Sequence, residues 1–467
     1  MGYAKPSPTI PKATAMPQRT TEHLPFSSPP GRQIQADFSG GEFTSDAGLL
    51  LLREADRNLE LISALDRVIP DPRQPNLILH PQRTLLAQRI FGIAAGYEDL
   101  NDHQYLRDEP FWQILTDHPG PKEAPQLASP PTLCRLENRV NRQTLWEMAK
   151  VLVNTFINSY AIPPTHLTLD LDATDIEIHG HQERRFFHGY YDSHCFLPLY
   201  IFSGSRLLVA YLRPSNRDAS FHVRAILKLL IRRLREAWPE VQITIRGDSG
   251  FCRWRLMRWC DHNGIWYIFG LARNAVLERL AGPLTAMVEE YSRSDGRSYR
   301  TYEWCYYGAG TWDRERRVII KAEYLGGPNP KSNSRFVVTN LPGDARELYE
   351  CVYCERGDME NRIKEQFQVN ANRMSCHDFL ANQFRLLLSA AAYILDEYVR
   401  RVGLVGTELE RAEVRTIRTS LFKIIAWVKK TARRVVVKMA GNYRFIDLFK
   451  SVLNRIISIR STVTATG

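Results

Sequence analysis

The chain has 467 residues, a formal net charge of +11 and 44% hydrophobic residues, a composition typical of globular proteins. No apolar run approaches the ~20 residues of a membrane-spanning helix, and the N-terminal residues contain no apolar signal core. These features disfavour membrane and secreted proteins and predict a cytoplasmic one. The basic excess predicts a polyanionic partner, either nucleic acid or an anionic membrane surface.

The N-terminal third is predicted to be helical after a disordered arm. Residues 1–35 are rich in Pro, Ser and Thr and lack a hydrophobic pattern. From Thr44, the segment TSDAGLLLLREADRNLELISALDRV begins with residues that cap helices, and apolar residues then recur at helical spacing. The pattern continues to about Phe156, so residues 36–160 are expected to form a helical region.

The period of the hydrophobic pattern changes in the middle of the chain. The runs LTLDLDAT, CFLPLYIFSG and RLLVAYLRP are short and rich in strand-forming residues, and the last two are expected to form a hairpin. A long amphipathic helix, the strand VQITIRG, a short helix closed by Gly264 and the strand IWYIFGLA follow. The order βββαβαβ predicts an α/β core over residues 161–275.

Three further segments follow this core. Residues 276–343 contain several runs with β character. Residues 344–378 are expected to contain a helix, whose pattern Gly357 interrupts. Residues 379–467 are expected to be helical and are increasingly basic.

Carboxylates occupy unusual places in this core. Asp170 and Asp172 lie on the same side of the strand LTLDLDAT, because alternate residues of a strand face the same way. Asp248 ends a later strand, and Glu360 lies on the helix after the β-rich segment. Two carboxylates on one face repel each other unless a cation or protons accompany them. Asp172, Asp248 and Glu360 are therefore candidate metal ligands, and their oxygens suit Mg²⁺ or Mn²⁺ rather than zinc.

Such a carboxylate set suits phosphoryl transfer on nucleic acid. Two metal ions about 3.5–4 Å apart can hold both oxygens of an in-line displacement. Each acid also has a plainer interpretation when it is taken alone. Asp248 could cap the next helix, Glu360 could be an exposed helical acid, and Asp170 could be solvated or support the other acids.

The residues around Glu360 form a pattern of their own. Tyr353, Arg356, Glu360 and Lys364 follow one another at spacings of three, four and four, which places them in one stripe on a regular helix. The stripe could be an ordinary salt-bridge ladder. As a functional face, it would hold an acid for metal between two cations, with a phenol for phosphate contact.

These features together resemble the DDE-type transposases of bacterial insertion sequences, whose catalytic core is ribonuclease-H-like. The D-x-T strand motif of that family is matched at Asp172, and the acid that ends its fourth core strand is matched at Asp248. The signature Y-x2-R-x3-E is matched by Tyr353, Arg356 and Glu360. The resemblance covers most of the chain after about residue 35.

One position departs from that family. The signature lysine would stand seven residues past Glu360, where this chain has Phe367. Lys364 lies one turn earlier on the same face, and it is the expected substitute.

The resemblance implies an α/β fold with a ribonuclease-H-like mixed sheet and a β-rich insertion, flanked by helical N- and C-terminal regions. The implied organisation is a disordered arm at 1–35, a helical DNA-binding and synapsis region at 36–160, the first part of the catalytic core at 161–275, a β-rich insertion subdomain at 276–343, a catalytic helix completing the core at 344–378 and a basic helical region at 379–467.

The resemblance also implies an activity and its partners. The enzyme would be a DNA transposase that nicks the ends of an insertion sequence and joins the 3′-hydroxyl ends to target DNA, with two Mg²⁺ or Mn²⁺ ions. Its partners would be double-stranded DNA, as terminal inverted repeats and target, and a second copy in a synaptic homodimer at the bacterial nucleoid. A catalytically inactive, transposase-derived DNA-binding protein would have the same charge and helices and stays open as the alternative.

Basic and aromatic residues are further candidates for DNA contact. The segment AWVKKTARRVVVK carries a basic run that is expected to bind phosphates. The resemblance makes Trp304 a candidate platform for stacking an unpaired base. The expected DNA-binding residues are Tyr353, Arg356, Lys364, Lys429, Lys430, Arg433, Arg434 and Trp304.

Two other motifs are weak signals. Cys351 and Cys354 form a CxxC pair without the second ligand pair of a zinc site, so reduced thiols are expected. The segment GDSG at residues 247–250 resembles the nucleophile region of trypsin-like serine proteases, but the long helices predicted on both sides of it do not fit that fold.

Overall fold

The computed structural model describes residues 24, 26–118, 126–327, 329–431 and 434–465. The predicted disordered arm at residues 1–35 falls mainly on residues 1–23 and 25, which lie outside the described residues.

The N-terminal region is mostly helical, as its hydrophobic pattern predicts. Its elements are β1 (Phe43–Thr44), α1 (Leu50–Leu59), α2 (Leu61–Val68), α3 (Gln82–Ala95), α4 (His103–Leu106), α5 (Pro110–Leu115), α6 (Pro130–Asn138) and α7 (Arg142–Asn158). The side chain of Asn141 caps α7 by accepting a hydrogen bond from the Thr144 N–H at 2.9 Å. Nearly all of α3 is buried, which is the behaviour of a helix inside a core.

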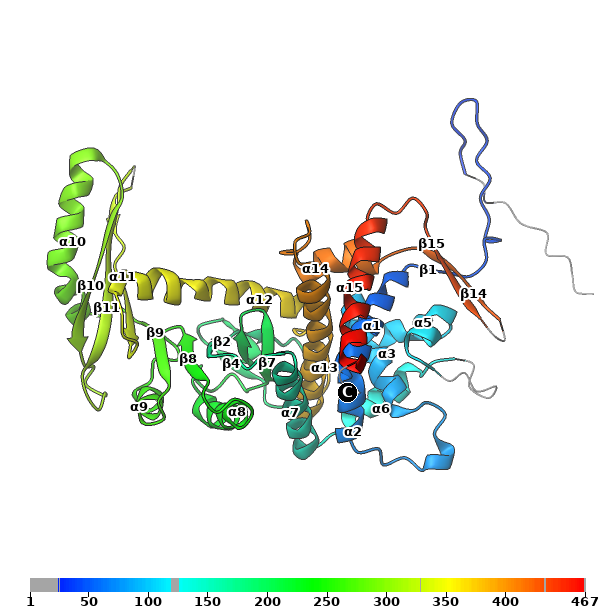
Figure 1. Ribbon diagram of the computed structural model, residues 1–467, viewed down its shortest axis with the longest axis horizontal. Coiled ribbons are helices and arrows are strands. Elements are labelled where there is room, and N and C mark those ends of the chain that lie inside the picture. The colour runs from blue at the N-terminus through cyan, green and yellow to red at the C-terminus, as the bar shows by residue number, and fades with distance from the viewer. Residues whose placement is uncertain (1–23, 25, 119–125, 328, 432–433, 466–467) are drawn as a thin grey trace, which may run out of the picture.

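A mixed sheet forms the centre of the other half (Figure 1). Its strands are β2 (His166–Ala173), β6 (Leu199–Ser203), β7 (Arg206–Tyr211), β8 (Gln242–Gly247), β9 (Trp266–Leu271), β10 (Tyr299–Tyr307), β11 (Arg316–Leu325) and β13 (Arg335–Thr339). Their order is β10-β11-β13-β9-β8-β2-β6-β7, and β12 (Lys331–Ser332) pairs with β11. β2, β8 and β9 run parallel, whereas the other neighbours are antiparallel. The predicted α/β class with a mixed sheet flanked by helical regions is confirmed.

Helices cover one face of the sheet through alternating leucines. Leu167, Leu169 and Leu171 of β2 are buried in one cluster with residues of α8 (Val223–Ala237) and α9 (Trp254–His262). The intervening side chains, including Asp170 and Asp172, therefore face the other side. A small second sheet, in the order β3-β5-β4, follows β2 in the chain: β3 (Ile176–Glu177), β4 (Phe186–His188) and β5 (Ser193–Phe196).

The segment 276–343 is not a separate sheet. It is preceded at Asn274 by a side-chain cap, and α10 (Ala275–Asp295) then occupies its first part. Its strands extend the central sheet, because β13 pairs with β9 from Phe336–Leu271 to Thr339–Ile268. Buried Leu277 and Ala281 of α10 belong to the same core cluster as the sheet.

The run that carries Glu360 is helical but irregular. It consists of α11 (Ala345–Glu347), a π-helix (Leu348–Tyr353), a 3₁₀ turn (Cys354–Arg356) and α12 (Gly357–Gln368). The prediction that Tyr353, Arg356, Glu360 and Lys364 lie in one stripe of a regular α-helix is wrong, because the first two residues lie in a π-helix and a 3₁₀ turn and only the last two lie in α12. A π-helical turn is rare and often lies at a functional site.

The C-terminal region contains α13 (Phe379–Tyr398), a π-helical extension (Val399–Gly403), α14 (Val414–Ile417), a second π-helical turn (Arg418–Phe422), β14 (Ala426–Lys430), β15 (Val435–Met439) and α15 (Ile446–Ala465). The expectation of a wholly helical region is wrong for β14 and β15, which form an antiparallel hairpin joined to β1. The run Val435–Val437 explains this, because β-branched residues favour strands. Among the described residues, no helix is both long and apolar enough to cross a bilayer.

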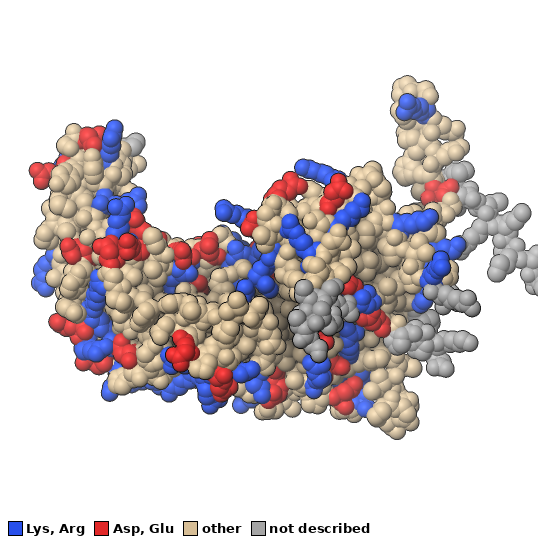
Figure 2. Space-filling view, viewed as in Figure 1, with Lys and Arg blue, Asp and Glu red and all other residues tan. Residues whose placement is uncertain are grey.

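The two halves meet at α13. Figure 1 shows the sheet and α10 towards one end, α15 and the N-terminal helices towards the other, and α12 running between the sheet and α13. α13 is buried along almost its whole length. Figure 2 shows that the upper edge of the molecule is hollowed between the α10 end and the α14 end, above the run of α11 and α12.

Candidate active site

Asp172 and Asp248 lie at the ends of two adjacent parallel strands. Leu171 of β2 is paired in register with Gly247 of β8, so each aspartate is the next residue of its chain. The carboxyl ends of parallel strands are a common place for functional sites. The sheet thus brings together two side chains that are separated by more than seventy positions in the sequence.

One guanidinium lies between the two carboxylates. Arg356 Nη2 is 3.2 Å from Asp172 Oδ2 and 3.9 Å from Asp248 Oδ2. The other oxygen of each carboxylate accepts a backbone hydrogen bond at 2.8 Å, from the Ala173 N–H and the Gly250 N–H respectively. Backbone donors thus orient both aspartates so that their Oδ2 atoms face one positive centre.

The charge of Arg356 does not fully neutralise the surrounding acids. Burial raises the pKa of Asp172 to about 6, Arg356 opposes that rise, and the charges of Asp248 and Glu360 add to it. Only 8% of Asp172 is exposed, whereas Glu360 is exposed on the first turn of α12. A carboxylate that still resists ionisation beside an arginine would be stabilised by a further cation.

The three acids do not converge into one metal site in this conformation. Among the described residues, no group of three His, Cys, Asp or Glu side chains is arranged to hold a metal ion. Asp172 and Asp248 do fit a cation, because the Arg356 guanidinium stands where both Oδ2 atoms point. The structure leaves Glu360 outside that pair, close enough to affect the pKa of Asp172.

A second ion pair lies two residues further back on the same strands. Asp170 and Arg246 are partners in the β2–β8 register, and both are buried. Arg246 Nε donates to Asp170 Oδ1 at 2.5 Å and Nη2 donates to Oδ2 at 2.9 Å. Its Nη1 also donates to the Val352 carbonyl in the π-helix. This arginine connects the sheet to the irregular run that carries Arg356 and Glu360.

Sequence reasoning missed Arg246, although a signal was present. Asp170 precedes Asp172 by two residues, and Arg246 precedes Asp248 by two residues. Opposite charges at equal distances from the ends of two predicted parallel strands indicate a cross-strand pair.

Tyr353 packs against the sheet beside Asp248. A Cβ on Gly270 of β9 would lie only 2.6 Å from the Tyr353 hydroxyl, so the glycine makes room for the phenol. Burial raises the pKa of Tyr353, Arg356 opposes that rise, and the nearby Asp248 adds to it. The hydroxyl therefore lies against the backbone of β9.

Lys364 and Phe367 have different surroundings. Lys364 is exposed on α12, one turn beyond Glu360, and no ion pair between the two is present in the part of the chain that the structure describes. Phe367 packs against the large core cluster of the helical half. The position of the signature lysine thus serves the packing of α12 in this chain.

The other predicted DNA-binding residues lie away from the acids in the fold. Trp304 is on β10, where its ring contacts Tyr306 and the Arg317 guanidinium. Lys429 and Lys430 are exposed at the end of β14, and Arg434 is exposed directly before β15. Arg433 lies outside the described residues.

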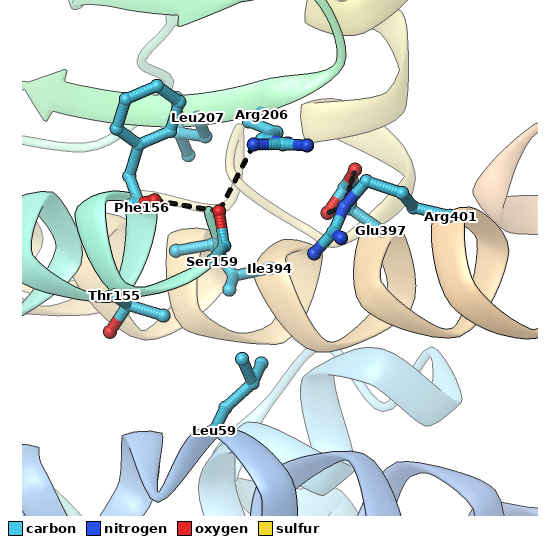
Figure 3. Close-up of a pocket in the computed structure, with 9 residues that line it drawn as sticks. All are labelled: Leu59, Thr155, Phe156, Ser159, Arg206, Leu207, Ile394, Glu397 and Arg401. Atoms are coloured by element: carbon cyan, nitrogen blue, oxygen red, sulfur yellow. Dashed lines mark hydrogen bonds and ion pairs between the residues drawn. The ribbon is translucent and has the colours of Figure 1, made fainter. Parts of the chain in front are cut away.

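A small pocket elsewhere belongs to the junction of the two halves. It lies among α1, α7, β7 and α13, and Figure 3 shows Arg206 bonded to Ser159 and Arg401 beside Glu397. None of the predicted site residues lines it. The Arg206–Ser159 hydrogen bond there joins β7 to the end of α7.

Comparison with known proteins identifies a family. A family model described as "Transposase DDE domain group 1" matches residues 26–461. A search of curated proteins finds no match. Among solved structures, the cryo-EM structure of a piggyBac transposase synaptic complex with hairpin DNA is similar, with a TM-score of 0.40 and 11% identity, covering 81% of this chain and 80% of that chain.

Proposed function

Since the chain belongs to the transposase DDE domain group 1 family, we propose that it is a DNA transposase that nicks the ends of an insertion sequence and joins the 3′-hydroxyl ends to target DNA. DDE transposases are generally catalytic polynucleotidyl transferases and typically use divalent metals. The observation that carries the proposal is the convergence of Asp172 and Asp248 on one cation position, with Glu360 nearby.

The proposed roles follow from the surroundings of each acid. Asp172 and Asp248 would hold Mg²⁺ or Mn²⁺ through their Oδ2 atoms, with Glu360 as the third ligand, and the metal would stabilise charge on the transferred phosphate. Ala173 and Gly250 keep the aspartates oriented through their N–H groups. Arg356 neutralises part of the charge before metal and DNA arrive.

The surface around Glu360 is suited to a DNA duplex. α12 runs below the hollow in the upper edge of the molecule, and Figure 2 shows basic side chains near the place where α12 meets α14. Lys364 is exposed on α12, and the β14–β15 hairpin exposes Lys429, Lys430 and Arg434. We propose that these cations contact phosphates, and that a second copy completes a synaptic complex.

Substitution of the acids tests this function. Asp172→Asn, Asp248→Asn and Glu360→Gln should each abolish excision of the gene with its native flanks from a plasmid, scored by amplification across the rejoined donor site. Asp358→Asn is the matched control, because Asp358 is an exposed acid on the same turn of α12. It should keep the activity of the parent.

The same assay separates the enzyme from its alternative. A parent protein that binds the flanking DNA and never excises it, with Mg²⁺ or Mn²⁺ present, would be the inactive DNA-binding derivative. Excision at the parental level by Glu360→Gln would remove that residue from the site.

A further inference from the structure

The helix α10, which stands at one end of the molecule in Figure 1, carries a row of exposed apolar side chains. This apolar row consists of Val276, Leu280, Met287 and Tyr291, which are between 37% and 52% exposed. Their spacings of four, seven and four residues place them along one side of the helix. A seven-residue interval between apolar residues is the repeat of helices that pack side by side. Apolar groups gathered at one exposed place mark an interaction surface.

α10 is already attached to the sheet through a different side. Leu277, Ala281 and Val288 are its buried apolar residues, and they follow the helical spacing of a separate row. The ring of Tyr291 is supported by Tyr299 at the start of β10, with ring centroids 5.7 Å apart. The fold thus holds α10 in place and leaves the apolar row uncovered.

α10 and the run that carries Glu360 lie on opposite faces of β10. The Asn274 side chain, which caps α10, donates a hydrogen bond to the Tyr307 hydroxyl at 3.1 Å. Tyr302 of the same strand contacts the ring of Tyr349 in the π-helix, with ring centroids 5.6 Å apart. Residues an odd number of positions apart on a strand face opposite sides. A partner on α10 would therefore not compete with DNA for the candidate active site.

The charges of α10 favour a protein partner over a polyanion. Four acids and two arginines give the helix a net charge of −2, whereas the whole chain has +11. This disfavours DNA and anionic membranes as the occupant of the apolar row. Arg293 is paired with Glu289 at 2.5 Å, whereas Arg279 and Glu290 have no ion-pair partner among the described residues. The charged residues of the helix are Glu278, Arg279, Glu289, Glu290, Arg293 and Asp295.

The apolar row is symmetric about its own midpoint. Leu280 and Met287 lie equally far from that midpoint, and so do Val276 and Tyr291. A two-fold axis makes residue i of one copy contact residue j of the other and the reverse. An antiparallel α10 from a second copy would therefore place Leu280 against Met287 and Val276 against Tyr291, two times each.

Arg279 and Glu290 match the same arrangement. They are eleven residues apart, so on a helix with 3.6 residues per turn they point in directions that differ by only about 20°. Both lie on the side of the apolar row that is further from the sheet. A two-fold axis brings equal sides of two antiparallel helices together, and the residue rise places Arg279 of one copy within about 3 Å, along the axis, of Glu290 of the other. Each charge that lacks a partner in one copy gains one in the pair.

We propose that the apolar row of α10 is a contact surface for a second copy of this chain, with the two α10 helices antiparallel. This inference rests on the proposed function, which includes a second copy in the synaptic complex, and it names the surface through which the copies meet. Because the row is only four residues long, the contact is small, and its affinity is expected to be roughly micromolar.

Sedimentation velocity of the full chain without DNA tests the contact. The parent should form dimers at micromolar concentrations. Leu280→Glu places a charge in each half of the apolar contact, so it should raise the dissociation constant by about 100-fold or more. Leu229→Glu is the matched control, because Leu229 is 37% exposed on α8, and it should dimerise as the parent does. A parent that stays monomeric at high micromolar concentrations, or a Leu280→Glu variant that dimerises normally, would overturn the proposal.

Exchange of the two charges tests the antiparallel register, and it leaves the apolar row intact. Arg279→Glu and Glu290→Arg should each raise the dissociation constant by about 3- to 10-fold, because each puts like charges opposite one another twice. The double variant Arg279→Glu with Glu290→Arg should regain the affinity of the parent. A double variant as weak as the two single variants would overturn the antiparallel arrangement.

The outcome is separable from that of the proposed function. A parent protein that excises DNA and shows no association through α10 would refute the α10 contact alone. A parent that dimerises through α10 and never excises would refute the proposed function and leave the contact in place.

Discussion

Asp170 and Asp172 stand on one face of β2, and each meets an arginine, yet the two groups differ in their balance of charge. Asp170 receives one hydrogen bond from Arg246 on each oxygen, and both side chains are buried. Asp172 shares a single nitrogen of Arg356 with Asp248, and Glu360 adds a third carboxylate nearby. The inner group, Asp170 with Arg246, is fully hydrogen-bonded, whereas in the outer group Asp172 and Asp248 share the guanidinium of Arg356 and Glu360 adds negative charge nearby.

We propose that this difference separates a structural site from a functional one. A buried ion pair in which both carboxylate oxygens accept hydrogen bonds gains little free energy from a further cation. Asp170 and Arg246 therefore serve to position the π-helix, through the hydrogen bond from Arg246 to the Val352 carbonyl. The carboxylates of the outer group are only partly neutralised by Arg356, so binding of a further cation would stabilise them electrostatically. Functional sites often have such a cost in stability.

The largest expected effect is on the inner pair. Arg246→Met leaves Asp170 buried without its partner, so the free energy of unfolding should fall by about 3–5 kcal/mol. Denaturant unfolding followed by circular dichroism measures the change. Arg253→Met is the control. It removes a long surface pair with Asp218 and a long hydrogen bond to the Cys252 carbonyl, so the variant should stay within about 0.5 kcal/mol of the parent. An unchanged midpoint for Arg246→Met would mean that Arg246 does not stabilise the buried Asp170 carboxylate.

Asp172→Asn should raise the free energy of unfolding, whereas Arg246→Met should lower it. The folded-state pKa of Asp172 is raised from 3.8 to about 6, so its ionisation opposes folding, and stability is lost as the pH rises through that window. The variant should therefore be more stable than the parent at pH 8, by about 2–3 kcal/mol for a shift of roughly two pKa units. The advantage should shrink as the pH falls from about 6 towards 4. A variant less stable than the parent at pH 8 would show that Asp172 is already well neutralised.

The strands and their faces could be predicted from the sequence because the pattern there is local. The alternation of Leu167, Leu169 and Leu171 with acids specifies a strand with one apolar face, and the structure places those leucines in one core. The register of β2 and β8, which brings Asp172 next to Asp248, follows from parallel pairing of two such strands.

The partners of the arginines could not be predicted in the same way. The π-helical turn coincides with a contact between Arg246 and Val352, residues more than a hundred positions apart, and helical spacing alone predicts a regular stripe there. Arg356 was expected on a DNA-facing stripe, and in the structure its guanidinium lies beside Asp172 and Asp248. The β14–β15 hairpin was not predicted, because the basic residues around Lys430 do not distinguish a strand from a helix. The valines of this segment favour a strand.

Removal of Arg356 tests whether its guanidinium occupies the cation position between Asp172 and Asp248. If its guanidinium stands in for a metal ion, Arg356→Gln should bind Mn²⁺ more tightly, by about 10-fold for a gain near 1.4 kcal/mol. Electron paramagnetic resonance of free Mn²⁺ measures the affinity without any DNA. In the parent, binding should strengthen as the pH rises through about 6, because Asp172 must lose its proton.

A double variant provides the control for that experiment. Asp172→Asn together with Arg356→Gln should lose the added affinity, because one of the two converging oxygens no longer carries charge. Equal Mn²⁺ affinity in the parent and in Arg356→Gln would mean that the arginine does not occupy the metal position.

The smallest expected effect concerns Lys364, an exposed cation of α12 that has no ion pair with Glu360. Because the lysine is not paired with that acid, Lys364→Met should change the free energy of unfolding by less than about 0.5 kcal/mol. If Lys364 contacts a phosphate in place of the lysine that Phe367 replaces, its loss should reduce the magnitude of the slope of log affinity against log salt by about 1. Lys228→Met is the matched control, since Lys228 is exposed on α8, which packs on the opposite face of the sheet. A salt slope for Lys364→Met equal to that of the parent and of the control would place the phosphate contact on another residue.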